Sequence, residues 1–195
     1  MKSNIQKVAL FGTSADPPTI GHKKIIEELA KIYKLVISYA SDNPSKKHSA
    51  NLFYRSLLLK TLINDFDNPN IYFDQELSSP WAISSIRKCK EKYNIVDIDF
   101  VIGSDLLEEI LVWKNINELF KEVTLYIIPR IDYPIKDKSL RLIDEYKGKF
   151  KISLFKIPKI SSSNIRESIN DSGLPKCLIP IIKKNNLYSL LNKKK

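Results

Sequence analysis

The stretch "GTSADPPTIGH", residues 12–22, follows the short apolar run Val8–Phe11. This stretch holds two of the five glycines, two of the ten prolines and one of the two histidines in the chain. Gly12 lets the backbone turn away from a strand, and Pro17 and Pro18 fix φ just before a helix. In a parallel sheet, the loop after the first strand usually contacts phosphate. We expect the following helix to aim its unpaired N–H groups and positive dipole end at an anion.

Apolar runs of strand length alternate with segments of helical period along the rest of the chain. Strands are predicted at 7–11, 35–39, 71–73, 99–102, 123–128 and 151–155. Helices are predicted at 20–33, 52–64, 82–93, in stretches up to about residue 120, at 163–169 and at 175–184. This order predicts an α/β fold with a Rossmann-like, doubly wound parallel sheet covered on both faces. We expect one domain over residues 1–195, with 131–140 as a mobile surface loop.

The formal charge of +10 favours an anionic substrate. The lysines are scattered and form no basic stripe with interleaved aromatics, so we expect no nucleic-acid partner. Residues 1–10 contain no leader pattern and no apolar run is long enough to span a bilayer, so no membrane association is expected. The two distant cysteines, Cys89 and Cys177, predict neither a disulfide framework nor a metal site and favour the cytoplasm. A homo-oligomer is left open.

Two polar side chains lie three residues apart at the start of the first predicted helix. Thr19 and His22 therefore share a face, and both supply directed donors that carry no fixed charge. Such donors suit oxygens whose negative charge grows during phosphoryl or nucleotidyl transfer. The alternative is an ordinary helix start with a surface histidine, which leaves the glycines and prolines unexplained.

A second helix start, "ISSSNIR" at residues 160–166, also favours an anion. Its serines and Asn164 are natural capping residues. Arg166 places a positive charge at the already positive end of the helix dipole, which is unfavourable unless an anion is held there. We therefore predict that the helix starts carrying His22 and Arg166 converge on one triphosphate.

These stretches resemble a known family. "GTSADPPTIGH" is similar to the signature of nucleotidyltransferases with an H/TxGH motif, which Thr19, Gly21 and His22 fill. It also resembles the longer GGTFDPPHxGH form of bacterial nicotinate-nucleotide adenylyltransferases, with departures at Thr13, Ala15 and Thr19. Threonine at the last position is typical of pantetheine-phosphate adenylyltransferases. "ISSSNIR" resembles the family's ISSTxIR motif, which implies that Ser162 and Arg166 contact ATP phosphates.

The middle of the chain resembles the acceptor side of the same family. "DNPSKKH" at 42–48 is similar to its NPxxK region, which implies that Lys46 or Lys47 meets the acceptor phosphate, although an exposed basic loop explains the letters equally well. The following helix offers Arg55 as a supporting residue. "ELSSPWAISSI" at 76–86 resembles the SYTxxTL segment, with Trp81 in place of the tyrosine and Ala82 in place of the threonine, so that only backbone recognition of a nicotinate carboxylate remains.

Two further stretches complete the resemblance. "FVIGSDLLEEILVWKNINELF" at 100–120 matches the family's IIGxD…W pattern, which implies that Gly103 and Asp105 hold the ribose and that Trp113 stacks on the pyridine ring. A tryptophan on an amphipathic helix is otherwise more often a core residue. "LPKCLIPIIKKNNLY" at 174–188 resembles the LPxxVxxYIxxxxLY ending of the nicotinate branch.

The resemblance implies transfer of the adenylyl group of ATP to nicotinate mononucleotide, which forms deamido-NAD and pyrophosphate in NAD biosynthesis. Mg²⁺ would be held mainly by the ATP phosphates. The implied catalytic residues are His22, Thr19 and Arg166. The implied ATP-binding residues are Gly12, Thr13, Ser14, Gly21, His22, Gly103, Asp105, Ser162 and Arg166. The implied acceptor-binding residues are Lys46, Lys47, Arg55, Trp81, Ala82 and Trp113. The alternatives are a pantetheine-phosphate adenylyltransferase, a non-catalytic nucleotide sensor on the same fold and, less favoured, a nucleic-acid-binding module.

Overall fold

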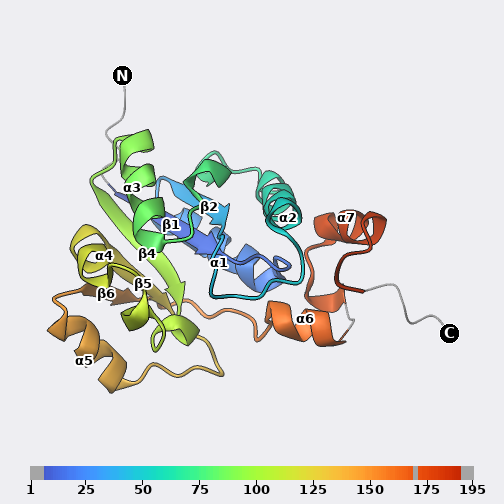
Figure 1. Cartoon of the computed structure of the whole chain (residues 1–195). Coiled ribbons are helices and arrows are strands. Elements are labelled where there is room, and N and C mark those ends of the chain that lie inside the picture. Colours follow the sequence, from blue (N-terminus) through green and yellow to red (C-terminus); the bar gives the residue numbers. More distant parts are fainter. Residues whose placement is uncertain (1–6, 169–170, 190–195) are drawn as a thin grey trace.

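The computed structural model describes residues 7–168 and 171–189 (Figure 1). Within them, parallel strands form one sheet in the order β3-β2-β1-β4-β5-β6. The strands are β1 Lys7–Thr13, β2 Val36–Ala40, β3 Ile71–Phe73, β4 Asp97–Gly103, β5 Thr124–Ile128 and β6 Lys149–Ile152. The chain winds outward from β1 to one edge, returns to β4 beside β1, and winds outward to the other edge. This is the predicted doubly wound sheet, and its topological switch point lies between β1 and β4.

Helices cover both faces of the sheet because successive strand residues point to opposite sides. The helices are α1 Ile20–Ile32, α2 Leu52–Asn64, α3 Ala82–Tyr93, α4 Ile116–Glu122, α5 Asp137–Glu145, α6 Ser162–Ser168 and α7 Ile179–Lys184. In β1, Val8 and Leu10 pack in a core with α3, α4 and α5, whereas Ala9 and Phe11 pack in a second core with α1, α2, α6 and α7. Figure 1 shows α7, near the C-terminal end, beside α2, and buried leucines and isoleucines join the two.

The segments predicted at 151–155 and 131–140 differ from the structure. The last strand was predicted at 151–155, but β6 spans Lys149–Ile152, and Leu154 beyond it is 99% exposed. An edge strand pairs on one side only, so its lysines alternate with apolar residues. The position of the apolar residues therefore does not indicate where such a strand begins and ends. The predicted loop 131–140 ends early because α5 begins at Asp137, where Leu140 and Ile143 can pack on the core.

The structure also differs from the helices predicted near the C-terminus. The helix predicted at 175–184 divides into a 3₁₀ turn, Lys176–Leu178, and α7. The end of the helix predicted at 163–169 lies outside the described residues, as do residues 1–6 of the segment expected to lack a leader. No helix in the described ranges combines the length and the apolar character that a bilayer crossing requires.

Candidate active site

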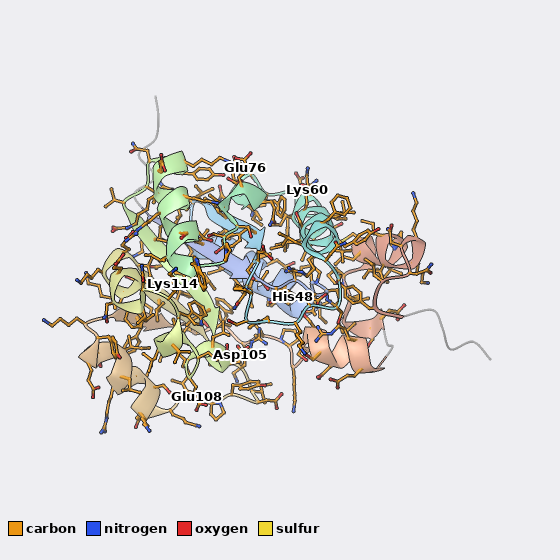
Figure 2. All side chains as sticks on the ribbon, viewed as in Figure 1. His48, Lys60, Glu76, Asp105, Glu108 and Lys114 are labelled. Carbon is orange, nitrogen blue, oxygen red and sulfur yellow. The ribbon has the colours of Figure 1, made fainter. Side chains whose placement is uncertain are left out.

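A cavity of about 650 Å³ opens at the carboxyl ends of the central strands. Residues far apart in the sequence line it, including the β1–α1 loop, the loop after β2, the starts of α3 and α6, and the segments after β4 and β5. In Figure 2, the lining residues His48, Asp105 and Lys114 lie around this region, whereas Glu76 and Lys60 lie away from it. Every predicted site residue except Arg55 lines this cavity.

Gly12 has a different local role from the predicted one. It remains inside β1, pairs with Tyr39 of β2, and does not have a positive φ. A Cβ at this position would lie 2.6 Å from atoms of the Tyr39 ring. The glycine is therefore required by a neighbouring side chain, and the chain leaves the strand only after Thr13.

A capping box fixes the start of α1. The hydroxyl oxygen of Thr19 accepts from the backbone N–H groups of Gly21 (3.1 Å) and His22 (3.4 Å), and the N–H of Thr19 donates to Nδ1 of His22 (3.0 Å). The prediction that these helix N–H groups are unpaired is therefore wrong for Gly21 and His22. Thr19 is 1% exposed and acts through the cap.

The same cap determines which nitrogen of His22 carries the proton. Because Nδ1 accepts from a backbone N–H, the neutral ring bears its hydrogen on Nε2. Nε2 lies 3.0 Å from the hydroxyl oxygen of Thr13, to which it donates. Burial, with a smaller contribution from the positive charge of Arg130, lowers the pKa of His22 to about 3. At neutral pH this side chain is an uncharged donor that faces the cavity.

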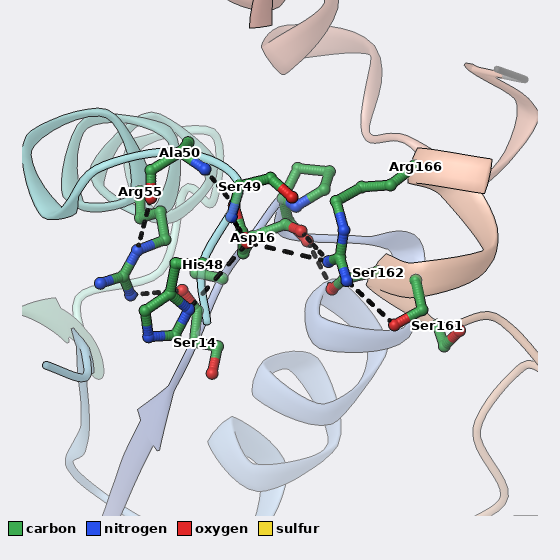
Figure 3. Close-up of polar contacts among 12 residues, drawn as sticks. Ser14, Asp16, His48, Ser49, Ala50, Arg55, Ser161, Ser162 and Arg166 are labelled. Atoms are coloured by element: carbon green, nitrogen blue, oxygen red, sulfur yellow. Dashed lines mark hydrogen bonds and ion pairs between the residues drawn. The ribbon is translucent and has the colours of Figure 1, made fainter. Parts of the chain in front are cut away.

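The second helix start meets the first. The hydroxyl of Ser162 donates to the carbonyl oxygen of Pro17 (2.8 Å), and Nη1 of Arg166 donates to the carbonyl oxygen of Asp16 (2.5 Å). Figure 3 shows Ser162 and Arg166 bonded to the β1–α1 loop. The helix starts that carry His22 and Arg166 therefore line one cavity, and their convergence on a triphosphate stays a prediction.

The segment after β4 presents a carboxylate and an arginine side by side. Oδ1 of Asp105 lies 3.0 Å from Nε of Arg130, but both atoms are buried and neither has a well-aligned hydrogen bond. A Cβ on Gly103 would lie 2.1 Å from that carboxylate oxygen. Gly103 is therefore the residue that lets Asp105 reach the cavity wall.

The side of the cavity next to α3 is more open. Trp81 is 39% exposed and precedes α3, and Nζ of Lys114 lies 4.6 Å above its ring centroid. Trp113 is half-buried and packs edge-on against Phe100, with 6.4 Å between ring centroids. The lining residues Ala82, Lys46 and Lys47 complete this side.

The predicted acceptor-binding role of Arg55 is not supported by its position. It is 1% exposed and does not line the cavity, and its guanidinium donates to the carbonyl oxygens of Ala50 (3.2 Å), Ser14 (2.8 Å) and Ser41 (2.7 Å). Figure 3 shows Arg55 reaching toward Ser14 and Ala50. The arginine predicted to support the acceptor instead holds two loops of the site together.

Sequence reasoning gave no role to several cavity residues, and three of them are charged or titratable side chains near the helix starts. Asp16 and His48 stand within quoted motifs but were given no role, and Arg130 was not considered. Arg130 lies two residues after the end of β5, so the rule that ligands bind at the carboxyl ends of parallel strands would have found it. Burial, followed by the charge of Arg55, lowers the pKa of His48.

The acidic side chains of the cavity are compatible with a metal ion that is bound mainly by the phosphates of a nucleotide. No cluster of three or more His, Cys, Asp or Glu residues suited to metal binding occurs in the ranges 7–168 and 171–189. The carboxylate of Asp16 already accepts two backbone N–H groups, and Asp105 faces Arg130. Mg²⁺ usually retains waters and phosphate oxygens in addition to one or two carboxylates, so a phosphate-borne ion fits this donor set.

Comparison with known proteins places this geometry in a family. The model described as cytidylyltransferase-like matches residues 10–168. The chain belongs to the cytidylyltransferase-like family. A protein of Synechocystis sp. named "Probable nicotinate-nucleotide adenylyltransferase" is 32% identical to this family member, with 93% of the chain and 98% of that protein covered. A protein of Sulfurimonas denitrificans with the same name is 36% identical, with 87% and 88% covered.

A solved structure supports the fold independently. The nicotinic acid mononucleotide adenylyltransferase of Plasmodium falciparum, in complex with NaAD, superposes with a TM-score of 0.77 at 20% identity, and 95% of this chain and 98% of that chain are covered. At that identity the likeness establishes the fold of this family member. The resemblance to nicotinate-nucleotide adenylyltransferases, first drawn from short motifs, is confirmed by the curated relatives over nearly the whole chain.

Proposed function

We propose that this chain transfers the adenylyl group of ATP to nicotinate mononucleotide, forming deamido-NAD and pyrophosphate in NAD biosynthesis. The names of the curated relatives support this activity. The observation that carries it is the meeting of two helix starts, with His22 and Arg166, on one cavity whose other side presents two tryptophans. We place the reaction in the cytoplasm, which suits the free thiols of Cys89 and Cys177.

The chemistry needs no protein nucleophile. A phosphate oxygen of the acceptor attacks the α-phosphorus of ATP, the new P–O bond forms, and the bond to the β-phosphate breaks as pyrophosphate leaves. The chain accelerates this step by alignment and by stabilising charge. His22 donates from Nε2 to a phosphate oxygen in place of Thr13, and Arg166 supplies a positive charge from the opposite helix.

Other residues hold the two nucleotides. We assign Gly12, Thr13, Ser14, Gly21 and Ser162 to the wall around the ATP phosphates, with Thr19 acting through the cap. Asp105 accepts from ribose hydroxyls. Arg130, its neighbour at 3.0 Å, provides a further positive charge near the phosphates. Bound Mg²⁺ would neutralise charge on phosphate oxygens and orient them.

The acceptor binds toward α3. Trp113 or Trp81 offers an aromatic face to the pyridine ring, and Lys46 or Lys47 faces the acceptor phosphate. Trp81 provides no side-chain cap for α3, so the N–H groups of Ala82 and Ile83 are available to a carboxylate, whereas that of Ser84 donates to the carbonyl oxygen of Trp81. This arrangement favours the nicotinate acceptor although Ala82 lacks a hydroxyl.

Acceptor profiling tests the proposal. The purified protein is incubated with ATP, Mg²⁺ and one of three acceptors: nicotinate mononucleotide, its amide or phosphopantetheine. Pyrophosphate release fastest with the first acceptor is the expected result. Faster release with phosphopantetheine would establish the pantetheine alternative, suggested by Thr19 in the motif. ATP binding without release from any acceptor would establish a nucleotide sensor.

A further inference from the structure

Asp16 is a buried carboxylate without an assigned role, in the loop between β1 and α1. It is 2% exposed, and a buried charge is tolerated only when it is well paired. Oδ2 accepts from the N–H of Ser49 at 2.7 Å, and Oδ1 accepts from the N–H of Ala50 at 3.0 Å. Both donors belong to the loop after β2, which carries Lys46 and Lys47. One side of the carboxylate is therefore bound to the proposed acceptor loop.

The other side of Asp16 faces the proposed ATP site. Nη1 of Arg166 lies 3.8 Å from Oδ2 and donates to the main-chain oxygen of the same residue. Figure 3 shows Asp16 between Ser49 and Ala50 on one side and Arg166 on the other. A single residue thus contacts both Arg166 and the loop that carries Lys46 and Lys47.

The surroundings of Asp16 reinforce this position. Arg55 braces the loops on both sides of it through the carbonyl oxygens of Ser14, Ser41 and Ala50. Nδ1 of His48 lies 4.0 Å from Oδ2. Because both carboxylate oxygens already accept from the acceptor loop, the group is engaged in holding protein segments.

We propose that Asp16 is a positioning residue that sets the acceptor loop, residues 41–50, against Arg166 so that the two nucleotides meet in line. The proposal rests on the adenylyl transfer described above. Asp16 acts through the backbone of Ser49 and Ala50 and through Arg166. Its loss should misalign bound substrates more than it weakens their binding.

The test compares Asp16→Asn with Asp65→Asn. The first variant keeps the size of the side chain but loses the charge and one acceptor, whereas Asp65 lies outside the cavity and forms a surface ion pair with Lys23 at 3.0 Å. Amide hydrogen exchange at Ser49 and Ala50 is measured in the ligand-free proteins. We expect it to rise roughly tenfold to a hundredfold in Asp16→Asn, the factor for one charge-assisted hydrogen bond, and to stay unchanged in Asp65→Asn.

Steady-state kinetics give the second readout. In Asp16→Asn, kcat should fall roughly 10²-fold, the cost of a misplacement of about 1 Å, while KM for each substrate changes by less than about threefold. Unchanged exchange at Ser49 and Ala50, or a kcat equal to that of Asp65→Asn, overturns the proposal. A shift confined to the Mg²⁺ dependence, without faster exchange, overturns it in favour of a metal-binding role.

A second variant covers a failure of Asp16→Asn to fold. Ser49→Pro keeps the carboxylate and removes the N–H at 2.7 Å. Faster exchange at Ala50 and a smaller fall in kcat are expected, and wild-type values of both overturn the proposal. If the wild-type protein releases no pyrophosphate, the proposed function fails, while the exchange data still decide whether Asp16 holds the loop.

Discussion

The two ends of the cavity are built differently. On the proposed ATP side, Thr19, Asp16 and His22 are buried. Thr19 and His22 form the cap of α1, Asp16 accepts from the loop after β2, and α6 is attached through Ser162 and Arg166. On the proposed acceptor side, Trp81 is 39% exposed and the ammonium group of Lys114 lies above its ring. A fixed donor array stabilises developing charge, whereas an open aromatic surface mainly supplies binding. Changes on the first side should therefore affect stability and kcat, and changes on the second should affect KM.

The largest expected effect is on stability, at the residue that braces the buried side. Arg55→Met removes the guanidinium and leaves the carbonyl oxygens of Ser14, Ser41 and Ala50 without their donor. We expect the free energy of unfolding in urea to fall by about 3–5 kcal/mol. Lys23→Met, which removes a surface ion pair to Asp65, should cost less than about 1 kcal/mol. Similar losses in both variants would contradict the bracing role.

Removal of the buried donor comes next. His22→Ala should lower kcat by roughly 10² to 10³, the loss measured for a single oxyanion donor, because only His22 offers Nε2–H from the cap of α1. Pyrophosphate release at saturating ATP and nicotinate mononucleotide measures it, and circular dichroism checks the fold. An unchanged kcat would remove His22 from the mechanism and make the ATP side merely structural.

The pH dependence of stability probes the same histidine. Burial holds the pKa of folded His22 at about 3, whereas an unfolded histidine titrates near 6.5. The unfolded chain therefore binds a proton first, and the free energy of unfolding should fall as the pH drops from about 6.5 toward 3. His48, whose pKa is also lowered, contributes in the same direction. The measurement is Tm at several pH values from 8 to 5.

His22→Gln provides the control for this slope. The variant cannot titrate at that position, so the decrease in Tm between pH 8 and pH 5 should be smaller than in the wild type. Carboxylates with lowered pKa, such as Asp74, lose their contribution only at more acidic pH. Equal slopes in the two proteins would show that His22 is not held neutral by the fold.

The smallest expected effect lies on the exposed side. Trp81→Ala removes an aromatic surface that is 39% exposed, and the KM for nicotinate mononucleotide should rise about 3- to 10-fold with the KM for ATP unchanged. Tyr72→Ala, on the surface of β3 outside the cavity, should change neither constant. A fall in kcat with constant KM would place Trp81 in alignment and weaken the contrast between the two sides.

The local spacing of apolar residues predicted much of the fold, because the strand and helix periods are local properties of the sequence. The alternation from β1 to β5 and the doubly wound class follow from apolar spacing and from the need to cover both sheet faces. β6 was placed less well and α5 was not predicted, since an edge strand and a surface helix each bury only one side. Their positions depend on neighbours that the local pattern does not contain.

The sequence by itself determined where donors suited to an anion stand, because "GTSADPPTIGH" and "ISSSNIR" each join a helix start to such a donor. Only the tertiary structure decided how they act. The hydrogen bond from Ser162 to Pro17 joins residues that lie 145 positions apart in the sequence, and the bond from Arg166 to Asp16 joins residues that lie 150 positions apart. It also turned Arg55 inward, paired Asp105 with Arg130 and left His22 uncharged. Burial and long-range contact set charge state and orientation, and neither property belongs to a residue before the chain has folded.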